Sequence, residues 1–137
     1  HDSHKGVMRW VERLNRVYRA EPGLHARDCD PAGFEWVDAS DADNSVLSFL
    51  RKGASPEEEV LCVFNFTPVP RPDYRVGVTS GGWWAEIADS DATEFGGSGA
   101  TLGGGVKADK EPWHGRPYSV KLQLPPMAAV FLKRPAK

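Results

Sequence analysis

Hydrophobic residues in the first twenty positions recur with the spacing of an amphipathic helix. The apolar stripe consists of Val7, Trp10, Val11, Leu14, Val17 and Tyr18. This pattern predicts a helix over Lys5 to Arg19 that Ser3 caps and that ends before Pro22. Because Glu12 interrupts the basic residues on the other sides, we expect the stripe to pack on a neighbouring element rather than on a membrane.

The hydrophobic pattern changes after Phe34 from helical to extended. Five consecutive apolar residues, Val60 to Phe64, are followed by Pro68 and Pro70, which predicts a strand at 60–66 that is buried on both faces in mid-sheet. Further strands are predicted at 34–37, 46–51, 74–78, 83–87, 118–124 and 127–132, the first two as a hairpin. The chain is therefore expected to be mainly β, an antiparallel Greek-key β-sandwich preceded by one helix.

A glycine-rich segment from Asp89 to Pro117 interrupts the strand pattern, with only a short strand predicted at Val106-Lys107. Glycines in such number could cradle a phosphate, but no Gly-Lys-Ser/Thr follows and no helix begins after them. We therefore expect a long loop that fits against another surface.

Composition and charge narrow the classes of partner. A formal net charge of -2 gives no electrostatic reason to expect a nucleic acid or a membrane, whereas a neutral sugar polymer is compatible with such a surface. No apolar run approaches the roughly 20 residues of a membrane-spanning helix. Cys29 and Cys62 are interpreted as free thiols, which favours a reducing compartment, the cytoplasm.

Metal ligands and acids are present, but their spacing does not form a site. His1 and His4 lie three residues apart without a third ligand, so we expect no metal and no cofactor. Asp89, Asp91 and Glu94 share one loop that cannot set the separation of a carboxylate pair.

Nucleophilic catalysis is not expected either. Cys62 falls inside the predicted buried strand, and His114 lies in a loop without an assigned partner. Asn65-Phe66-Thr67 matches the N-glycosylation sequon, but its place at the end of a core strand favours a chance match. We assign no catalytic residue to this chain.

Aromatic residues are the more promising candidates, because sugar rings stack their C–H faces on indole and phenol rings. Trp83 and Trp84 are adjacent on a predicted strand, so one points into the core and the other is exposed or covered by a partner. Trp83, Trp113 and Tyr118 are candidate residues for binding a glucan. Packing against a neighbouring loop or domain is the interpretation that we favour for each of them.

The run Asn65-Phe66-Thr67-Pro68-Val69-Pro70-Arg71, followed by Tyr74-Arg75, resembles the C-terminal region of bacterial glycogen branching enzymes, the 1,4-α-glucan branching enzymes of the α-amylase superfamily. The likeness continues in the right order at 4–7, 14–19, 30–36, 45–49, 90–92, 96–99, 114–117 and 124–126. Ordered matches over this length are a stronger signal than any single motif.

The resemblance implies a transferase that cuts an α-1,4 glucan and rejoins the piece through an α-1,6 bond. In that family the catalytic Asp, Glu and second Asp lie on strands of a (β/α)8 barrel that precedes this region. Residues 1–27 would be the last helix of that barrel and residues 28–137 the C-terminal β-sandwich. The chain would be a fragment that is inactive alone.

Two roles follow from the resemblance. In the first, the domain is a structural cap of the catalytic barrel, and the isolated fragment exposes its helix or self-associates through it. In the second, it is an accessory module that binds α-glucan through surface tryptophans. We favour the first role.

Overall fold

The computed structural model of the chain describes residues 2–99 and 103–136. Its α-helix α1 (Asp2–Ala20) precedes all of the strands, as predicted. The strands are β1 (Phe34–Asp41), β2 (Val46–Arg51), β3 (Val60–Asn65), β4 (Arg71–Val78), β5 (Gly82–Asp89), β6 (Gly105–Ala108), β7 (Tyr118–Leu124) and β8 (Ala128–Lys133). Short 3-10 helices lie between them: η1 (Pro22–Leu24), η2 (Pro31–Gly33), η3 (Pro56–Glu58) and η4 (Thr93–Phe95).

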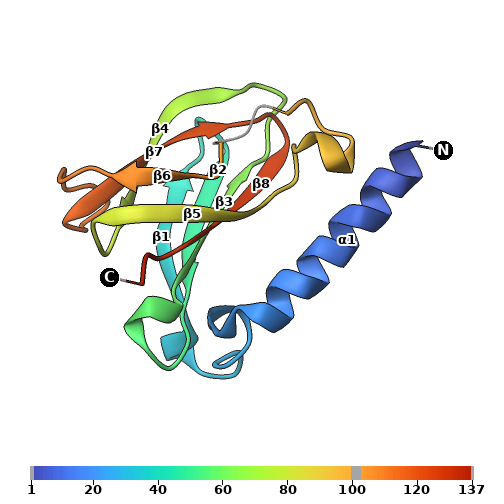
Figure 1. Ribbon diagram of the computed structural model, residues 1–137. Helices are drawn as coiled ribbons and strands as arrows, with labels where there is room; N and C mark the ends of the chain where they lie inside the picture. Colours follow the sequence, from blue (N-terminus) through green and yellow to red (C-terminus); the bar gives the residue numbers. More distant parts are fainter. Residues whose placement is uncertain (1, 100–102, 137) are drawn as a thin grey trace.

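The strands form two antiparallel sheets that face each other (Figure 1). The larger sheet has the order β1-β2-β3-β8-β5-β6, and β4 pairs with β7 in a two-stranded sheet. Because β4 and β7 belong to the smaller sheet, the chain crosses between the sheets before and after each of these strands, in agreement with the predicted sandwich. The predicted central strand is confirmed, since β3 lies between β2 and β8 with Val60, Leu61, Cys62 and Val63 all buried.

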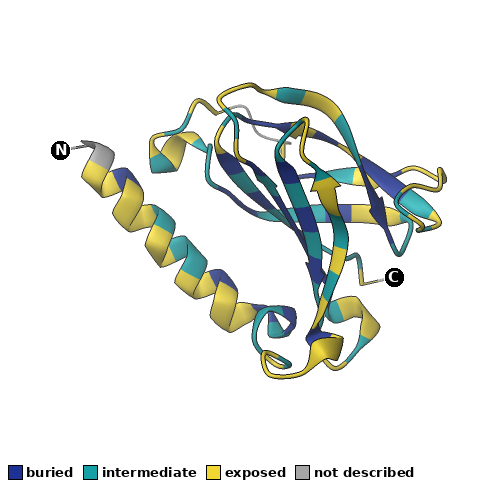
Figure 2. Cartoon of the chain, turned by 180° about the vertical axis from the view of Figure 1, so that it is seen from behind, coloured by how far each residue is buried: buried dark blue, intermediate teal, exposed yellow. Residues whose placement is uncertain are grey.

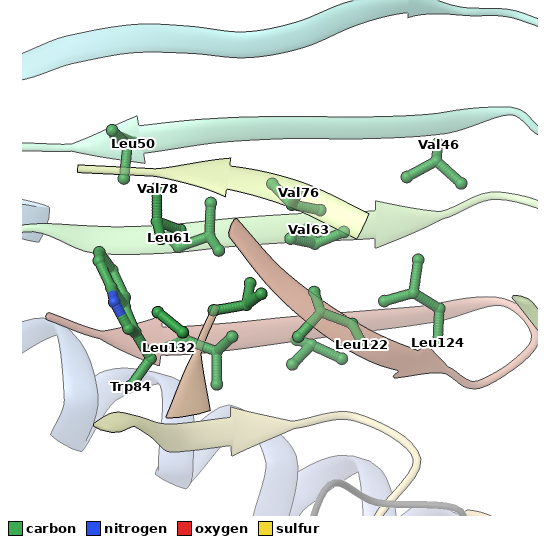
Figure 3. Close-up of a cluster of buried hydrophobic side chains, with 13 residues drawn as sticks. Val46, Leu50, Leu61, Val63, Val76, Val78, Trp84, Leu122, Leu124 and Leu132 are labelled. Carbon is green, nitrogen blue, oxygen red and sulfur yellow. The ribbon is translucent and has the colours of Figure 1, made fainter. Parts of the chain in front are cut away.

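The core lies between the two sheets, where alternate side chains of each strand point inward. The larger sheet contributes Leu50, Leu61 and Leu132, and the smaller sheet contributes Val76 and Leu122 (Figure 3). Trp84 is fully buried at the edge of this cluster, and its indole N–H donates to the carbonyl oxygen of Ser80 at 3.1 Å. The prediction that only one of the two adjacent tryptophans enters the core is confirmed.

Two details of the predicted elements are wrong. Ser3 lies inside α1, which begins at Asp2, so Ser3 is not the N-cap. The first strand does not end at Val37 but continues to Asp41 through two irregularities of its register with β2. Asp38 accepts hydrogen bonds from the backbone N–H and the hydroxyl of Ser40, so acidic residues typical of a turn lie in an irregular strand end.

A short elbow of residues 21–33 joins α1 to β1 at one end of the sandwich (Figure 1). Arg51 of β2 donates to the carbonyl oxygen of Leu24 at 2.9 Å and also pairs with Asp28. Gly23 lies so close to the backbone of Glu58 that a Cβ would collide with it. The elbow is thereby fixed to the sheet that it leads into.

The predicted long loop does fit against another surface. Its helix η4 packs on α1, where the rings of Phe95 and Trp10 meet edge to face with centroids 5.0 Å apart. Glu94 and Arg13 form an ion pair at 3.1 Å beside them. The short strand predicted at Val106-Lys107 is confirmed as part of β6.

Candidate functional site

Six aromatic side chains line the face of the larger sheet that is turned away from the core. We call this set the aromatic face; it consists of Phe34, Trp36, Phe49, Phe64, Phe66 and Phe131. Successive rings are in contact across the strands, with centroids 5.0 Å apart for Phe34 and Phe49 and 5.6 Å apart for Phe49 and Phe64. For Phe49, Phe64 and Phe131 the arrangement follows from strand alternation, because their neighbours Leu50, Val63 and Leu132 point into the core.

The helix α1 covers only part of the aromatic face. Trp10 stacks on Phe131 with centroids 6.4 Å apart, but Trp36 remains 52% exposed and Phe66 56% exposed. A connected apolar surface of this kind on a small domain indicates an interaction site.

The predicted apolar stripe of α1 is divided by the fold. Val17 is buried and Trp10 half-buried against this chain, whereas Val7 is 61% exposed and Val11 48% exposed. Met8 is exposed beside them. Figure 2 shows α1 as largely exposed along its length. Part of the helix surface that the sequence predicted to be packed therefore has no covering element within the described residues.

A second feature is a hollow of about 580 Å³ at the end of β1, which we call the β1–β4 hollow. It is lined by Asp38, Asp41 and Asn44, by residues 70–75 at the start of β4, and by Trp113 and His114 of the loop before β7. Three segments that are distant in sequence thus converge on one depression.

His114 connects two walls of the hollow. Its Nδ1 accepts a hydrogen bond from the backbone N–H of Gly77 at 3.1 Å, and its Nε2 lies 3.3 Å from a carboxylate oxygen of Asp38. Burial lowers the pKa of His114, against the opposing effect of Asp38. The imidazole is therefore neutral at pH 7, with its proton on Nε2 directed at Asp38.

Asp41 is the acceptor of a second cluster in the hollow. Its carboxylate accepts hydrogen bonds from the hydroxyl of Tyr74 and from the amide of Asn44. Burial opposes the charged form, but these hydrogen bonds prevail and lower the pKa of Asp41. Burial and the bond to Asp41 both raise the pKa of Tyr74, so the phenol stays protonated and donates.

Trp113 stands at the rim of the hollow with 43% of its surface exposed. Its backbone exchanges hydrogen bonds with Arg116, and its carbonyl oxygen approaches Gly77 so closely that a Cβ there would collide with it. The guanidinium carbon of Arg75 lies 5.8 Å from the centre of the indole ring. The position of this tryptophan is thus fixed by both backbone and side-chain contacts.

The structure separates the three aromatic residues that the sequence singled out. Trp83 is half exposed on β5, on the side opposite to buried Trp84, while Tyr118 is half-buried on β7 with its ring beside Gly81. No ring contact joins Trp83, Trp113 and Tyr118 anywhere in residues 2–99 and 103–136. Sequence reasoning missed Trp36 and Phe66, although aromatic residues two positions apart, at 34 and 36 and at 64 and 66, are the signal of one strand face.

The acids weighed as catalytic candidates have structural contacts instead. Asp91 accepts hydrogen bonds from the backbone N–H and the hydroxyl of Ser98, and Glu94 pairs with Arg13. Asp89 is buried, and one of its oxygens accepts from the N–H of Asp91. Nothing in this arrangement resembles a carboxylate pair that flanks an open site.

The remaining candidates are His1 and His4 as metal ligands, Cys62 as a nucleophile and Asn65 as a glycosylation site. His1 lies outside the described residues, and the described part of the chain holds no group of three or more His, Cys, Asp or Glu that could bind a metal. Burial raises the pKa of the Cys62 thiol to about 12, so it is unreactive at neutral pH. The Asn65 amide is buried and donates to the carbonyl oxygens of Val69 and Pro125.

Comparison with known proteins identifies the fold and its relatives. The model of the family described as "Alpha amylase, C-terminal all-beta domain" matches residues 36–135. The chain is 56% identical over 131 residues to the 1,4-alpha-glucan branching enzyme GlgB of Aquifex aeolicus, covering 96% of this chain and 21% of that protein. It is 57% identical over 130 residues to the protein of the same name from Cereibacter sphaeroides, covering 95% and 18% respectively.

A solved structure shares the fold at lower identity. A trehalulose synthase MutB variant superposes on 88% of the chain with a TM-score of 0.55 and 20% identity, over 16% of its own length. The chain thus spans about a fifth of the length of its curated relatives and matches a similarly small part of the solved enzyme. Among the helices described, none is long and apolar enough to cross a membrane.

Proposed function

The chain belongs to the family of alpha amylase C-terminal all-β domains, and on this premise we propose that it is the non-catalytic C-terminal module of a 1,4-α-glucan branching enzyme. Support comes from relatives that carry this name and are more than half identical over nearly the whole chain. The parent enzyme would cut α-1,4 glucan and rejoin the piece by an α-1,6 bond, with cytoplasmic glycogen as its product. The free thiols of exposed Cys29 and buried Cys62 suit that reducing compartment.

The role of the module is to cap the catalytic barrel of the parent enzyme. The observation that carries this role is the uncovered apolar surface formed by Phe34, Trp36 and Phe66 of the aromatic face and by Val7, Met8 and Val11 of α1. Residues 1–27 would be the last barrel helix, so α1 would pack on the barrel with its exposed side and on the sandwich with Trp10 and Val17. The matching relatives are about five times as long as the chain, so most of the parent enzyme lies outside it. The catalytic barrel in that larger part is the partner that we propose for this surface.

A replacement experiment tests the proposal. The matching 131-residue segment of the Aquifex aeolicus enzyme is exchanged for this chain, and branching of amylose is followed by the loss of iodine staining. We expect the hybrid to retain branching activity and the enzyme truncated before the segment to lose it or to unfold at lower temperature. A hybrid that is folded, by circular dichroism, but inactive would contradict the proposal.

The isolated chain supplies the complementary test. Asp91 and Glu94 are engaged in structural contacts, and under the proposal the catalytic residues of the parent enzyme lie outside this chain. The 137-residue chain should therefore leave the iodine staining of amylose unchanged. Branching by the purified chain would refute its non-catalytic role.

A further inference from the structure

We propose that His114 is a pH-dependent clasp between the two sheets: the neutral imidazole holds the loop before β7 to both β1 and β4, and the protonated imidazole releases β4. The neutral ring contacts both sheets at once, because its Nδ1 accepts from the backbone N–H of Gly77 in β4 at 3.1 Å and its Nε2 lies 3.3 Å from Asp38 in β1. Among the described strands, β1 is at the edge of the larger sheet and β4 pairs only with β7. His114 therefore joins two strand edges that share no backbone ladder.

The bond to Gly77 requires the neutral ring. A backbone N–H can only donate, so the ring atom opposite it must carry a lone pair. Protonation places a hydrogen on Nδ1, and two donors then face each other. The contact with Asp38 responds in the opposite way, since an imidazolium N–H donates to a carboxylate more strongly than a neutral ring does. A single proton thus breaks the contact with one sheet and strengthens the contact with the other.

The charged groups around the ring are mixed in sign. Burial lowers the pKa of His114 below its ordinary value of about 6.5, and Arg116 of the same loop acts in the same direction. Asp38 and Asp41 of β1 act against this lowering without overcoming it. The groups from β4 that line the same hollow are Arg71, Asp73, Tyr74 and Arg75. The clasp is therefore closed at neutral pH and opens only below about pH 6.5.

The rest of the loop has contacts of its own with both sheets. Arg116 pairs with Glu35 of β1, and Arg75 of β4 pairs with Asp109 at 3.3 Å where the loop begins. These ion pairs hold the loop independently of the imidazole. We expect protonation to break the bond to Gly77 and to widen the β1–β4 hollow at this point, while the sandwich remains folded.

An NMR titration of the intact 137-residue chain from about pH 7.5 to about pH 4.5 tests the clasp. The imidazole nitrogens of His114 and the amide of Gly77 should shift with one midpoint, which should lie below about 6.5. At the low-pH end, the protection of the Gly77 amide against hydrogen exchange, corrected for intrinsic rates, should fall by about fivefold. This is the change expected from the loss of one ordinary hydrogen bond.

Two substitutions at position 114 separate the effect of the proton from that of the ring. His114→Asn places an amide oxygen near the position of Nδ1, accepts the left-handed backbone there, with φ of 51°, and does not titrate. In this variant Gly77 should stay protected at every pH. His114→Ala removes the acceptor, so Gly77 should be unprotected at every pH. His25→Asn, in the elbow and outside the hollow, should leave the transition unchanged.

Asp38→Asn adds a test of direction. It removes a charge that favours the imidazolium, so the common midpoint should move to lower pH. An equal loss of Gly77 protection in the unmodified chain and in His114→Asn overturns the proposal, as does a titration of His114 that the Gly77 amide does not follow. Simultaneous loss of protection throughout β3 and β4 would mean general unfolding and overturns it as well.

Discussion

At the scale of single residues, Asp89 is a carboxylate held where water cannot reach it. It is 2% exposed, and its Oδ2 has no hydrogen-bond partner among the described residues. Burial raises its pKa to about 6, although the N–H of Asp91 stabilises the charged form. Since the pKa in the folded state lies above its unfolded value of about 3.9, protonation of Asp89 stabilises the fold.

This relation gives a prediction for pH and stability. The contribution of Asp89 is fully present below about pH 4 and is lost as the pH rises through about 6. Asp89→Asn removes the buried charge, so at pH 8 we expect it to raise the free energy of unfolding by about 1 kcal/mol. Urea unfolding at pH 4, 6 and 8 measures the change, with the exposed Asp43→Asn as control; a gain that is equal at all three pH values would contradict the assignment.

Asn65 gives a second prediction at this scale. Its amide N–H₂ donates to the carbonyl oxygens of Val69 at 2.9 Å and Pro125 at 3.0 Å, and its Oδ1 accepts from Thr67. Asn65→Asp keeps the shape but removes both donors, and it should lower the free energy of unfolding by about 2–3 kcal/mol. Denaturant unfolding measures the loss. Thr67→Val removes the hydroxyl that donates to Oδ1 of Asn65, and so measures the contribution of that hydrogen bond separately. A loss below about 0.5 kcal/mol, the level of ordinary surface substitutions, would show that the turn does not depend on these bonds.

At the scale of elements, the contact between α1 and η4 is close enough to reverse the usual effect of a helix substitution. A Cβ at Gly6 would lie 2.8 Å from the carbonyl carbon of Phe95 and would collide with its oxygen. In an ordinary exposed helix, Gly→Ala stabilises by up to about 1 kcal/mol. Here the alanine must push η4 away from the helix.

We therefore expect Gly6→Ala to loosen the contact between α1 and η4. Faster amide exchange at residues 93–97 and a change in Trp10 fluorescence would report it, because Trp10 packs on Phe95. Asn15→Ala, at an exposed position of the same helix, should instead stabilise the protein by a few tenths of a kcal/mol, as expected from about 0.5 kcal/mol of helix propensity. Unchanged exchange in Gly6→Ala would mean that η4 is not held by the helix.

The sequence predicted elements well where the signal was local. The apolar run at 60–64 and the alternation at 118–124 identified β3 and β7, and Pro22 marked the end of α1. The β1–β4 hollow could not be predicted, because it depends on Asp38, Tyr74 and His114 meeting from three distant segments. The left-handed backbone of His114, with φ of 51°, belongs to the tight turn that Trp113 and Arg116 close by backbone hydrogen bonds, in which Gly115 also has a positive φ.

At the scale of the whole molecule, the exposed side of α1 leads to a prediction about the isolated chain. Without the barrel that we propose as its partner, the apolar surface of Val7, Met8 and Val11 remains in water and should bring two copies together at high concentration. Sedimentation velocity over a range of concentrations detects this association. The double variant Val7→Lys, Val11→Lys should be monomeric, whereas Trp83→Ala should associate as the parent chain does; association of the lysine variant would place the contact elsewhere.

The elbow at residues 21–33 has a mechanical consequence. Arg51 ties it to β2 through Leu24 and Asp28, and Tyr18 donates to Asp28 at 3.1 Å from the helix side. A boundary drawn between residues 27 and 28 would separate Arg51 from Leu24 and Tyr18 from Asp28, so the two proposed regions are bonded to each other across that boundary. The elbow should therefore act as a rigid connection and not as a hinge, so that a displacement of α1 is transmitted through Arg51 to β2, an inner strand of the larger sheet.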